Sequence, residues 1–219
     1  MDKDMLIQLW MANDFIASET RGQQIFDVLV WRCFLQDVEI QKCVFSECPL
    51  DNHHFISIDT IIHRPTTCKM HDLMHDLADS VSGNDCSILQ ESSSRQEICK
   101  DPHTPVHYSM HEVHHLSLDY VSNNTIGAMK EILDPRARTI LVLKNEFGIE
   151  IPVGMAKSKF MSLRALKAFS ISTHMTNLKH LRYLDCSYSS ISALPEATTM
   201  LYNLQTMKLI ACEDLKKLP

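Results

Sequence analysis

The sequence has no apolar run near the roughly 20 residues that a membrane-spanning helix requires. Its first residues, Met1–Asp4, offer neither the basic segment nor the apolar segment of a secretory signal, so we expect a cytoplasmic protein. Positive charge is in deficit, because 21 lysines and arginines stand against 27 acidic residues. The net charge of −6 argues against nucleic acid as a partner. The eight cysteines show no paired spacing, which is typical of free thiols in a reducing compartment.

The chain also lacks the motif that binds the phosphates of a nucleotide. The P-loop pattern G-x-x-x-x-G-K-S/T, whose backbone and lysine cradle phosphates, does not occur. The pair His71 and His75 lacks the glutamate and the third ligand of the zinc pattern H-E-x-x-H, and no cysteine stands in a basic helix start that would activate its thiol. We therefore predict no catalytic residue, no metal site, no cofactor and no enzymatic activity for this chain.

The N-terminal part contains a series of amphipathic segments. Apolar side chains recur at helical spacing over residues 4–16 and again over 22–34, where the stripe is aromatic and wide enough to be core. Residues 38–69 read as short β-like pieces broken by prolines, and a further helix is expected over 70–81. Two helices, a β ribbon and a third helix predict a winged-helix domain over residues 1–82.

The most informative segment is Cys68–Ala78, where a His-Asp pair starts the third expected helix and recurs one turn later. A helix start presents backbone N–H groups that can hold a phosphate beside the first histidine. The alternative is an ordinary helix start with solvated polar residues. His71 and His75, at i and i+4, could also form half a zinc site, although a third ligand is missing. The apolar residues of this helix have the spacing of one buried face: Met70, Leu73, Met74, Leu77, Ala78 and Val81.

A second group of histidines consists of His103, His107, His111, His114 and His115. Their spacing would stack them on a helix, but Pro102 and Pro105 interrupt any helix there. Adventitious metal affinity is one interpretation of this group. A metal-dependent enzyme built on the histidines is a further functional hypothesis, and metal analysis of the purified protein would test it.

The C-terminal part is a repeat, and residues 83–108, which are polar and rich in serine, are expected to link it to the first domain. Leu178, Leu181 and Leu184 recur about 23 positions later, within the roughly 20–29 residues of leucine-rich repeats. In such a coil a short strand points alternate side chains inward, and the next coil buries them. Residues 109–219 should therefore hold about five strands, three of them in irregular leading repeats and two in regular repeats at 178–219. The leading strands are expected at His115–Leu118, Ile140–Leu143 and Leu163–Leu166.

The repeat strands define a candidate partner-binding face. In the two regular repeats the outward positions of one strand align with those of the next. Such arrays bind partners on the concave side of the sheet, and the alternative is an ordinary solvent face. The residues expected to line this face are Tyr183, Asp185 and Ser187 in one repeat and Thr206, Lys208 and Ile210 in the next.

The order of these parts resembles the plant intracellular nucleotide-binding leucine-rich-repeat immune receptors. Met5–Ala12 is similar to the Leu-Ile-x-x-Trp-x-Ala helix of the winged-helix part of their NB-ARC module, and Gly22–Val30 is similar to the next helix. Met70, His71 and Asp72 match the family's MHD motif. Leu181–Asp185 and Leu201–Thr206 resemble the first regular repeats that follow.

The resemblance implies an α+β protein in which an α-helical winged-helix domain precedes a partial α/β leucine-rich-repeat solenoid. It also implies that His71 donates to a phosphate of bound ADP and that Asp72 supports this helix start, with ADP or ATP bound only in a full receptor. Because the P-loop is missing, we expect a fragment of such a disease resistance protein.

The partners implied are proteins: a pathogen effector, a guarded host protein or the receptor's own NB-ARC module. The competing hypothesis is a stand-alone leucine-rich-repeat adaptor or decoy that acts through the repeat surface without binding nucleotide.

Overall fold

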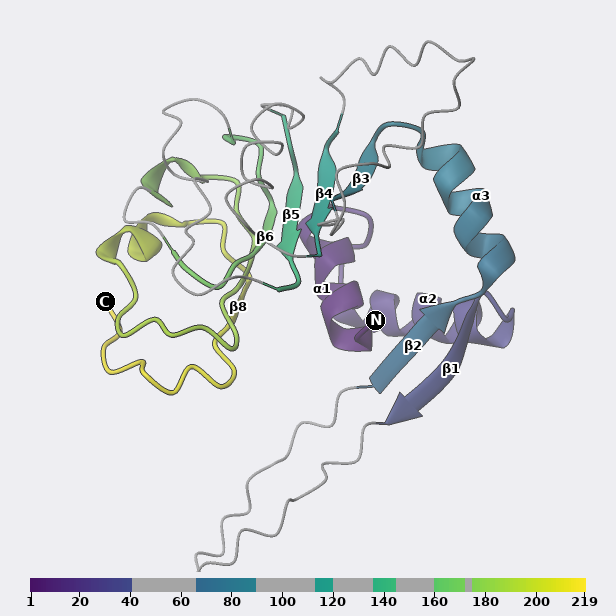
Figure 1. Ribbon diagram of the computed structural model, residues 1–219, viewed down its shortest axis with the longest axis horizontal. Coiled ribbons are helices and arrows are strands. Elements are labelled where there is room, and N and C mark those ends of the chain that lie inside the picture. Colours follow the sequence, from purple (N-terminus) through teal and green to yellow (C-terminus); the bar gives the residue numbers. More distant parts are fainter. Residues whose placement is uncertain (41–65, 90–112, 120–135, 145–159, 172–174) are drawn as a thin grey trace, which may run out of the picture. The chain divides into compact units, whose positions relative to one another are not determined.

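The computed structural model describes residues 1–40, 66–89, 113–119, 136–144, 160–171 and 175–219 (Figure 1). The chain divides into two compact units. One unit comprises residues 1–11 and 16–77, and the other comprises residues 12–15 and 78–219. In the described part of the chain, no helix is both long and apolar enough to cross a membrane.

Two helices open the first unit: α1 (Lys3–Ala12) and α2 (Glu19–Trp31). The Ser18 hydroxyl caps α2 by accepting a hydrogen bond from the Arg21 amide at 3.3 Å, a common role for serine before a helix. The two helices come very close at Gly22. A β-carbon there would lie 2.5 Å from Cγ2 of Ile7 and 2.8 Å from Cδ1 of Ile16, so the packing leaves room only for glycine.

An antiparallel ribbon and a third helix follow: β1 (Leu35–Ile40), β2 (Thr66–Met70) and α3 (Asp72–Ser82). Phe26, Leu35 and Cys68 form the buried core between α2 and the ribbon, and Leu29 and Val30 pack against it, so this part of the predicted stripe is core. Cys33 belongs to the same stripe but is exposed, so for this residue the prediction is wrong. The order of helix, helix, ribbon and helix is the one that the sequence indicated. The part of the expected ribbon at 41–65 lies outside the described residues.

The apolar face of α3 is exposed, and the prediction that it is buried is wrong. No residue of this helix is buried, and the exposed fractions of Leu73, Leu77 and Val81 are 72%, 52% and 78%. The apolar spacing correctly indicates that these side chains share one side of the helix. Spacing does not indicate what packs against that side, and within the described residues these side chains remain open to solvent.

The second unit contains a six-stranded parallel sheet in which each strand pairs with the next along the chain (Figure 1). The five strands expected from the sequence are present in order, and one further strand precedes them. Their bounds are β3 (Cys86–Leu89), β4 (His115–Leu118), β5 (Thr139–Val142), β6 (Ala165–Lys167), β7 (Tyr183–Asp185) and β8 (Thr206–Lys208).

The sheet therefore starts earlier than the sequence indicated, because β3 lies inside the expected linker at 83–108. Cys86 pairs with His115 and Leu89 with Leu118, so this short, partly polar strand is held by backbone hydrogen bonds to β4. The side chains of β3 show no clear alternation of buried apolar and exposed polar residues, and Ile88 is 62% exposed. The other described residues of the expected linker form no strand, and residues 90–112 lie outside the description.

The core of the second unit lies on one side of this sheet. Successive strands place Leu116, Ile140, Leu166 and Leu184 in register, and all four are buried. Burial of each such side chain contributes roughly 1.5–3 kcal/mol before conformational entropy is subtracted. Two short 3-10 helices lie between the last strands: η2 (Met175–Asn177) follows β6, and η3 (Glu196–Met200) follows β7. The apolar side chains of successive strands thus pack against one another on this side of the sheet.

Candidate functional site

His71 occupies the junction between strand β2 and helix α3. Its backbone N–H donates to the Phe34 carbonyl at 3.0 Å, so the ribbon holds the start of the helix in place. Its carbonyl accepts hydrogen bonds from the N–H groups of Met74 at 2.9 Å and His75 at 3.0 Å. The motif residue predicted from the sequence is therefore the residue that joins the ribbon to the helix.

The His71 ring caps its own helix. Its Nδ1 atom accepts a hydrogen bond from the Leu73 N–H at 3.2 Å, so Nδ1 carries no proton while this bond is made. The neutral ring then holds its proton on Nε2, and this N–H remains available to an outside acceptor. Because His71 already satisfies the N–H groups of Leu73, Met74 and His75, the helix start offers a phosphate fewer free backbone donors than the sequence suggested.

Asp72 is the first residue of α3, and its side chain is exposed. A carboxylate in the first turn is stabilised by the positive end of the helix dipole. The second copy of the pair, His75 and Asp76, is also exposed and lies one turn further along the helix. Only the first copy stands at the helix start, where the dipole and the ribbon act on it.

The structure brings the residues of the expected partner-binding face together, but half of them are not open to solvent. Asp185 accepts hydrogen bonds from the Tyr183 hydroxyl at 3.2 Å and from the Ser187 N–H at 2.9 Å, and all three residues are buried. The expectation of an open surface is wrong for these three, because their polar groups satisfy one another. Thr206 and Lys208 are half-buried and Ile210 is exposed, so these can still be reached.

Only two members of the histidine group lie within the described residues, His114 and His115. His114 Nδ1 lies 2.5 Å from Asp85 Oδ1, and His115 Nδ1 lies 3.0 Å from the Thr139 hydroxyl oxygen. Burial lowers the pKa of His115, and the nearby Asp85 opposes this effect. Across the ranges that the structure describes, no three His, Cys, Asp or Glu side chains are grouped to hold a metal.

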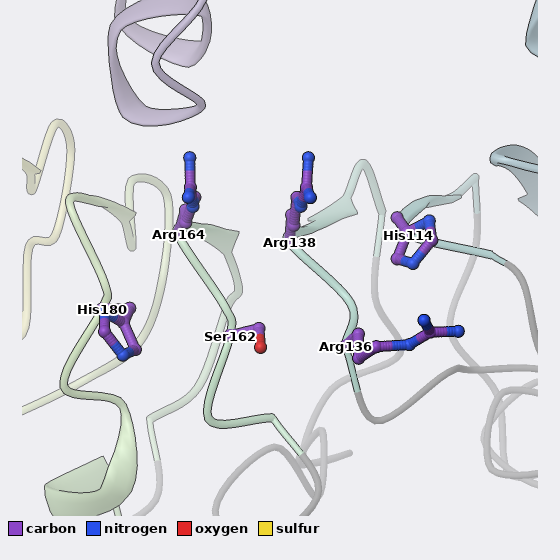
Figure 2. Close-up of a pocket in the computed structure, with 6 residues that line it drawn as sticks. All are labelled: His114, Arg136, Arg138, Ser162, Arg164 and His180. Atoms are coloured by element: carbon purple, nitrogen blue, oxygen red, sulfur yellow. The ribbon is translucent and has the colours of Figure 1, made fainter.

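The second unit also has a hollow that sequence reasoning missed. Its volume is about 370 Å³, and every charged side chain that lines it among the described residues is basic. Figure 2 shows the Arg138 and Arg164 side chains extended in the same direction, with Ser162 and His180 lying below them in this view. The lining residues are His114, Arg136, Arg138, Ser162, Arg164 and His180.

The backbone ladder explains why these basic residues meet. The amide of Arg138 donates to the carbonyl of His114, Arg164 donates to Arg138 and Arg182 donates to Arg164, at 2.7, 2.8 and 2.8 Å. These four residues, which we call the cationic row, each stand immediately before a strand of the parallel sheet. The sequence signal was a basic residue directly before successive strands. This pattern can be recognised only when the strands are aligned by their backbone pairing, because their spacing in the sequence is irregular.

Comparison with known proteins relates the chain to one group. Residues 1–51 match the sequence family of the disease resistance protein winged helix domain. Over 219 aligned residues the chain is 29% identical to a putative disease resistance protein of Arabidopsis thaliana, covering 98% of this chain and 14% of that protein. It is 32% identical over 110 residues to disease resistance protein RGA2 of Solanum bulbocastanum, covering 48% of this chain and 9% of that protein.

A putative disease resistance RPP13-like protein 1 of Arabidopsis thaliana is 26% identical over 216 residues, covering 94% of this chain and 18% of that protein. The chain thus spans less than a fifth of the length of each of these relatives. The family match confirms the winged-helix domain at the N-terminus, over α1, α2 and β1, and the structure confirms a mixed α and β protein. The matched range ends before His71.

Proposed function

We propose, from the relationship of this chain to the plant disease resistance proteins, that it is the winged-helix and leucine-rich-repeat part of an intracellular immune receptor. In the complete receptor, the winged-helix part helps to hold ADP and keeps the receptor in its resting state. The repeats recognise a protein or restrain the receptor. The protein recognised is a pathogen effector, a guarded host protein or the receptor's own nucleotide-binding module.

The sheet of the second unit supports the leucine-rich-repeat part of this proposal. Its strands are short, parallel and paired in chain order, and their inward leucines form one continuous core. The Ser187 hydroxyl accepts a hydrogen bond from the Ile210 N–H, 23 positions further on, which matches the repeat period in the sequence. A stack of coils with this period is what leucine-rich repeats form.

One observation carries the nucleotide part of the proposal: the His71 ring caps α3 through Nδ1 and thereby keeps an N–H donor on Nε2. A donor beside an exposed helix start suits a phosphate oxygen, and a carboxylate at position 72 is compatible with the dipole. These residues supply one donor and no phosphate cradle, since the chain contains no P-loop pattern. The proposed latch therefore concerns ADP bound in an intact receptor.

The free energy that the proposed His71 contact contributes to ADP binding is that of a single charge-assisted hydrogen bond. Such a bond contributes roughly 1.5–3 kcal/mol, which changes a two-state equilibrium by about one to two powers of ten. In an intact receptor that carries residues 1–82 of this chain, H71A should therefore accelerate ADP release about 10- to 100-fold, measured with labelled ADP.

Two control variants separate the latch from the helix cap. H75A removes the second histidine, which lies one turn away, and should leave ADP release unchanged. H71N keeps a side-chain acceptor for the helix start but loses the Nε2–H donor, so it should behave like H71A. Equal release rates for H71A and H75A would reject the latch.

A further inference from the structure

We propose that the cationic hollow of the second unit binds a compact, multiply charged phosphate-bearing anion, with Arg138 as its central contact. This inference goes beyond the proposed latch, since it involves neither His71 nor the first unit. It rests on how the basic and acidic groups of the second unit are distributed around the hollow.

The two ends of the cationic row already hold carboxylates. At one end, Asp85 contacts His114 at 2.5 Å. At the other end, Asp14 accepts hydrogen bonds from Arg164, at 2.7 Å, and from Arg182. The hydrogen bond from Arg182 lowers the pKa of the Asp14 carboxyl below its usual value, so Asp14 is ionised and both arginines have a true counter-ion.

Arg138 stands between these two ends without such a partner. Within the described residues it forms no salt bridge, while its neighbours in the row, His114 and Arg164, each contact a carboxylate. Arg138 and Arg164 stand before adjacent strands, whose backbones lie roughly 5 Å apart, so their side chains start close together. A bound anion would give Arg138 the counter-ion that its neighbours in the row already have.

The lining of the hollow defines the chemistry of this anion. Guanidinium groups present planar forks of N–H donors that match the oxygen pairs of a phosphate. The hydroxyl of Ser162 and the ring of His180 add further polar groups to the lining. The described lining contains no carboxylate, so nothing in it would repel a ligand of high negative charge.

The lining also favours a compact anion over an acidic peptide. Peptide-binding sites commonly anchor their ligands through apolar or aromatic pockets, and the lining residues that the structure describes include no aliphatic side chain and no Phe, Tyr or Trp. A volume of about 370 Å³ is at the lower end of the range for small-molecule sites. A small polyphosphate matches the volume of the hollow and is opposite in charge to the basic side chains that line it.

Binding of inorganic tripolyphosphate to the full 219-residue chain tests this proposal, by calorimetry at constant ionic strength with chloride as the reference. We expect saturable binding of one tripolyphosphate per chain and at least a tenfold weakening in R138Q. R182Q is the matched control, because Arg182 belongs to the same row but does not line the hollow, and its affinity should change less than threefold. R138K, which keeps the charge but not the fork, should lie between wild type and R138Q.

A second measurement excludes a merely structural effect of the substitution. Because Arg138 forms no salt bridge within the described residues, R138Q should melt at the same temperature as wild type without tripolyphosphate. Of these two proteins, the wild type should gain more thermal stability when tripolyphosphate is added.

Three results would overturn the proposal. One is the absence of saturable binding at constant ionic strength. Another is an equal loss of affinity in R138Q and R182Q, which would indicate diffuse electrostatics. The third is tighter binding of a poly-glutamate peptide than of tripolyphosphate, which would assign the hollow to an acidic protein partner.

Discussion

At the residue scale, hydrogen-bond partners decide what the titratable side chains of this chain can do. His71 is held by the Leu73 amide through Nδ1, and this fixes which ring nitrogen can serve an outside ligand. Asp14 has a positive φ of 62°, a conformation that aspartate tolerates, and this turn directs its carboxylate to Arg164 and Arg182. Burial of Cys186 raises the pKa of its thiol, so this buried cysteine is unreactive while Cys33 is exposed.

His115 makes the stability of the second unit depend on pH. Burial lowers its pKa in the folded chain below 6.5, and the charges around it are Asp85, which opposes the shift, and Arg138 and His114, which add to it. As pH falls below 6.5 the unfolded chain takes up the proton first, so stability is lost until the folded pKa is reached. We expect the free energy of unfolding to fall by at most about 1.4 kcal/mol per pH unit below pH 6.5.

Urea unfolding of wild type and H115N between pH 7.5 and 5 measures this effect. Asparagine can keep the hydrogen bond to the Thr139 hydroxyl but does not titrate. The stability difference between the two proteins should therefore shift in favour of H115N as pH falls. A difference that stays constant over this range would show that His115 does not carry the dependence.

At the element scale, periodicity located most of the structure. The spacing of apolar residues placed α1, α2 and α3 within a few positions, and the leucine repeat placed five of the six strands. These signals are local, because a helix or strand that buries one side must repeat with its own period. Strand β3 was missed because it is held by backbone pairing to β4 and leaves Ile88 exposed, which leaves little pattern in its side chains.

The close approach of α1 and α2 predicts the effect of one small substitution. G22A should raise helix propensity by about 1 kcal/mol, but its methyl group would lie 2.5 Å from Ile7. Overpacking of this kind costs typically 1–3 kcal/mol, so we expect a net destabilisation of about 1–2 kcal/mol. Thermal unfolding followed by circular dichroism measures it.

Q24A is the matched control on the exposed side of the same helix, and it should change stability by less than about 0.5 kcal/mol. A G22A protein as stable as wild type would show that the two helices do not pack as closely as described.

At the scale of the whole molecule, the sequence indicated two parts and their order, and the structure divides the chain into two units. The sequence alone does not show which side chains become neighbours when strands that are far apart in the chain pair in register. The cationic row joins residues before four successive strands, and its members become neighbours only once the irregular coils are stacked. Tyr183, Asp185 and Ser187 are a second example. Alternation along the strand predicted that they share one face of the sheet, but it did not predict that they are buried there.

The exposed apolar face of α3 also belongs to this scale. Leu73, Leu77 and Val81 are exposed on helix α3, which begins at Asp72, directly after His71. Monomeric soluble proteins rarely leave such apolar stripes open to solvent. The proposed latch places the start of this helix at the nucleotide, and a change at Asp72 should therefore alter the state of the whole receptor.

The resting activity of an intact receptor that carries residues 1–82 of this chain tests that central claim most directly. D72V removes the carboxylate at the helix start and adds a β-branched apolar residue, whereas D76V makes the same change one turn further on. We expect D72V to signal without any pathogen and D76V to stay as silent as the unmodified receptor, at equal protein levels. A D72V receptor that remains silent, or a D76V receptor that signals as strongly, would contradict the account.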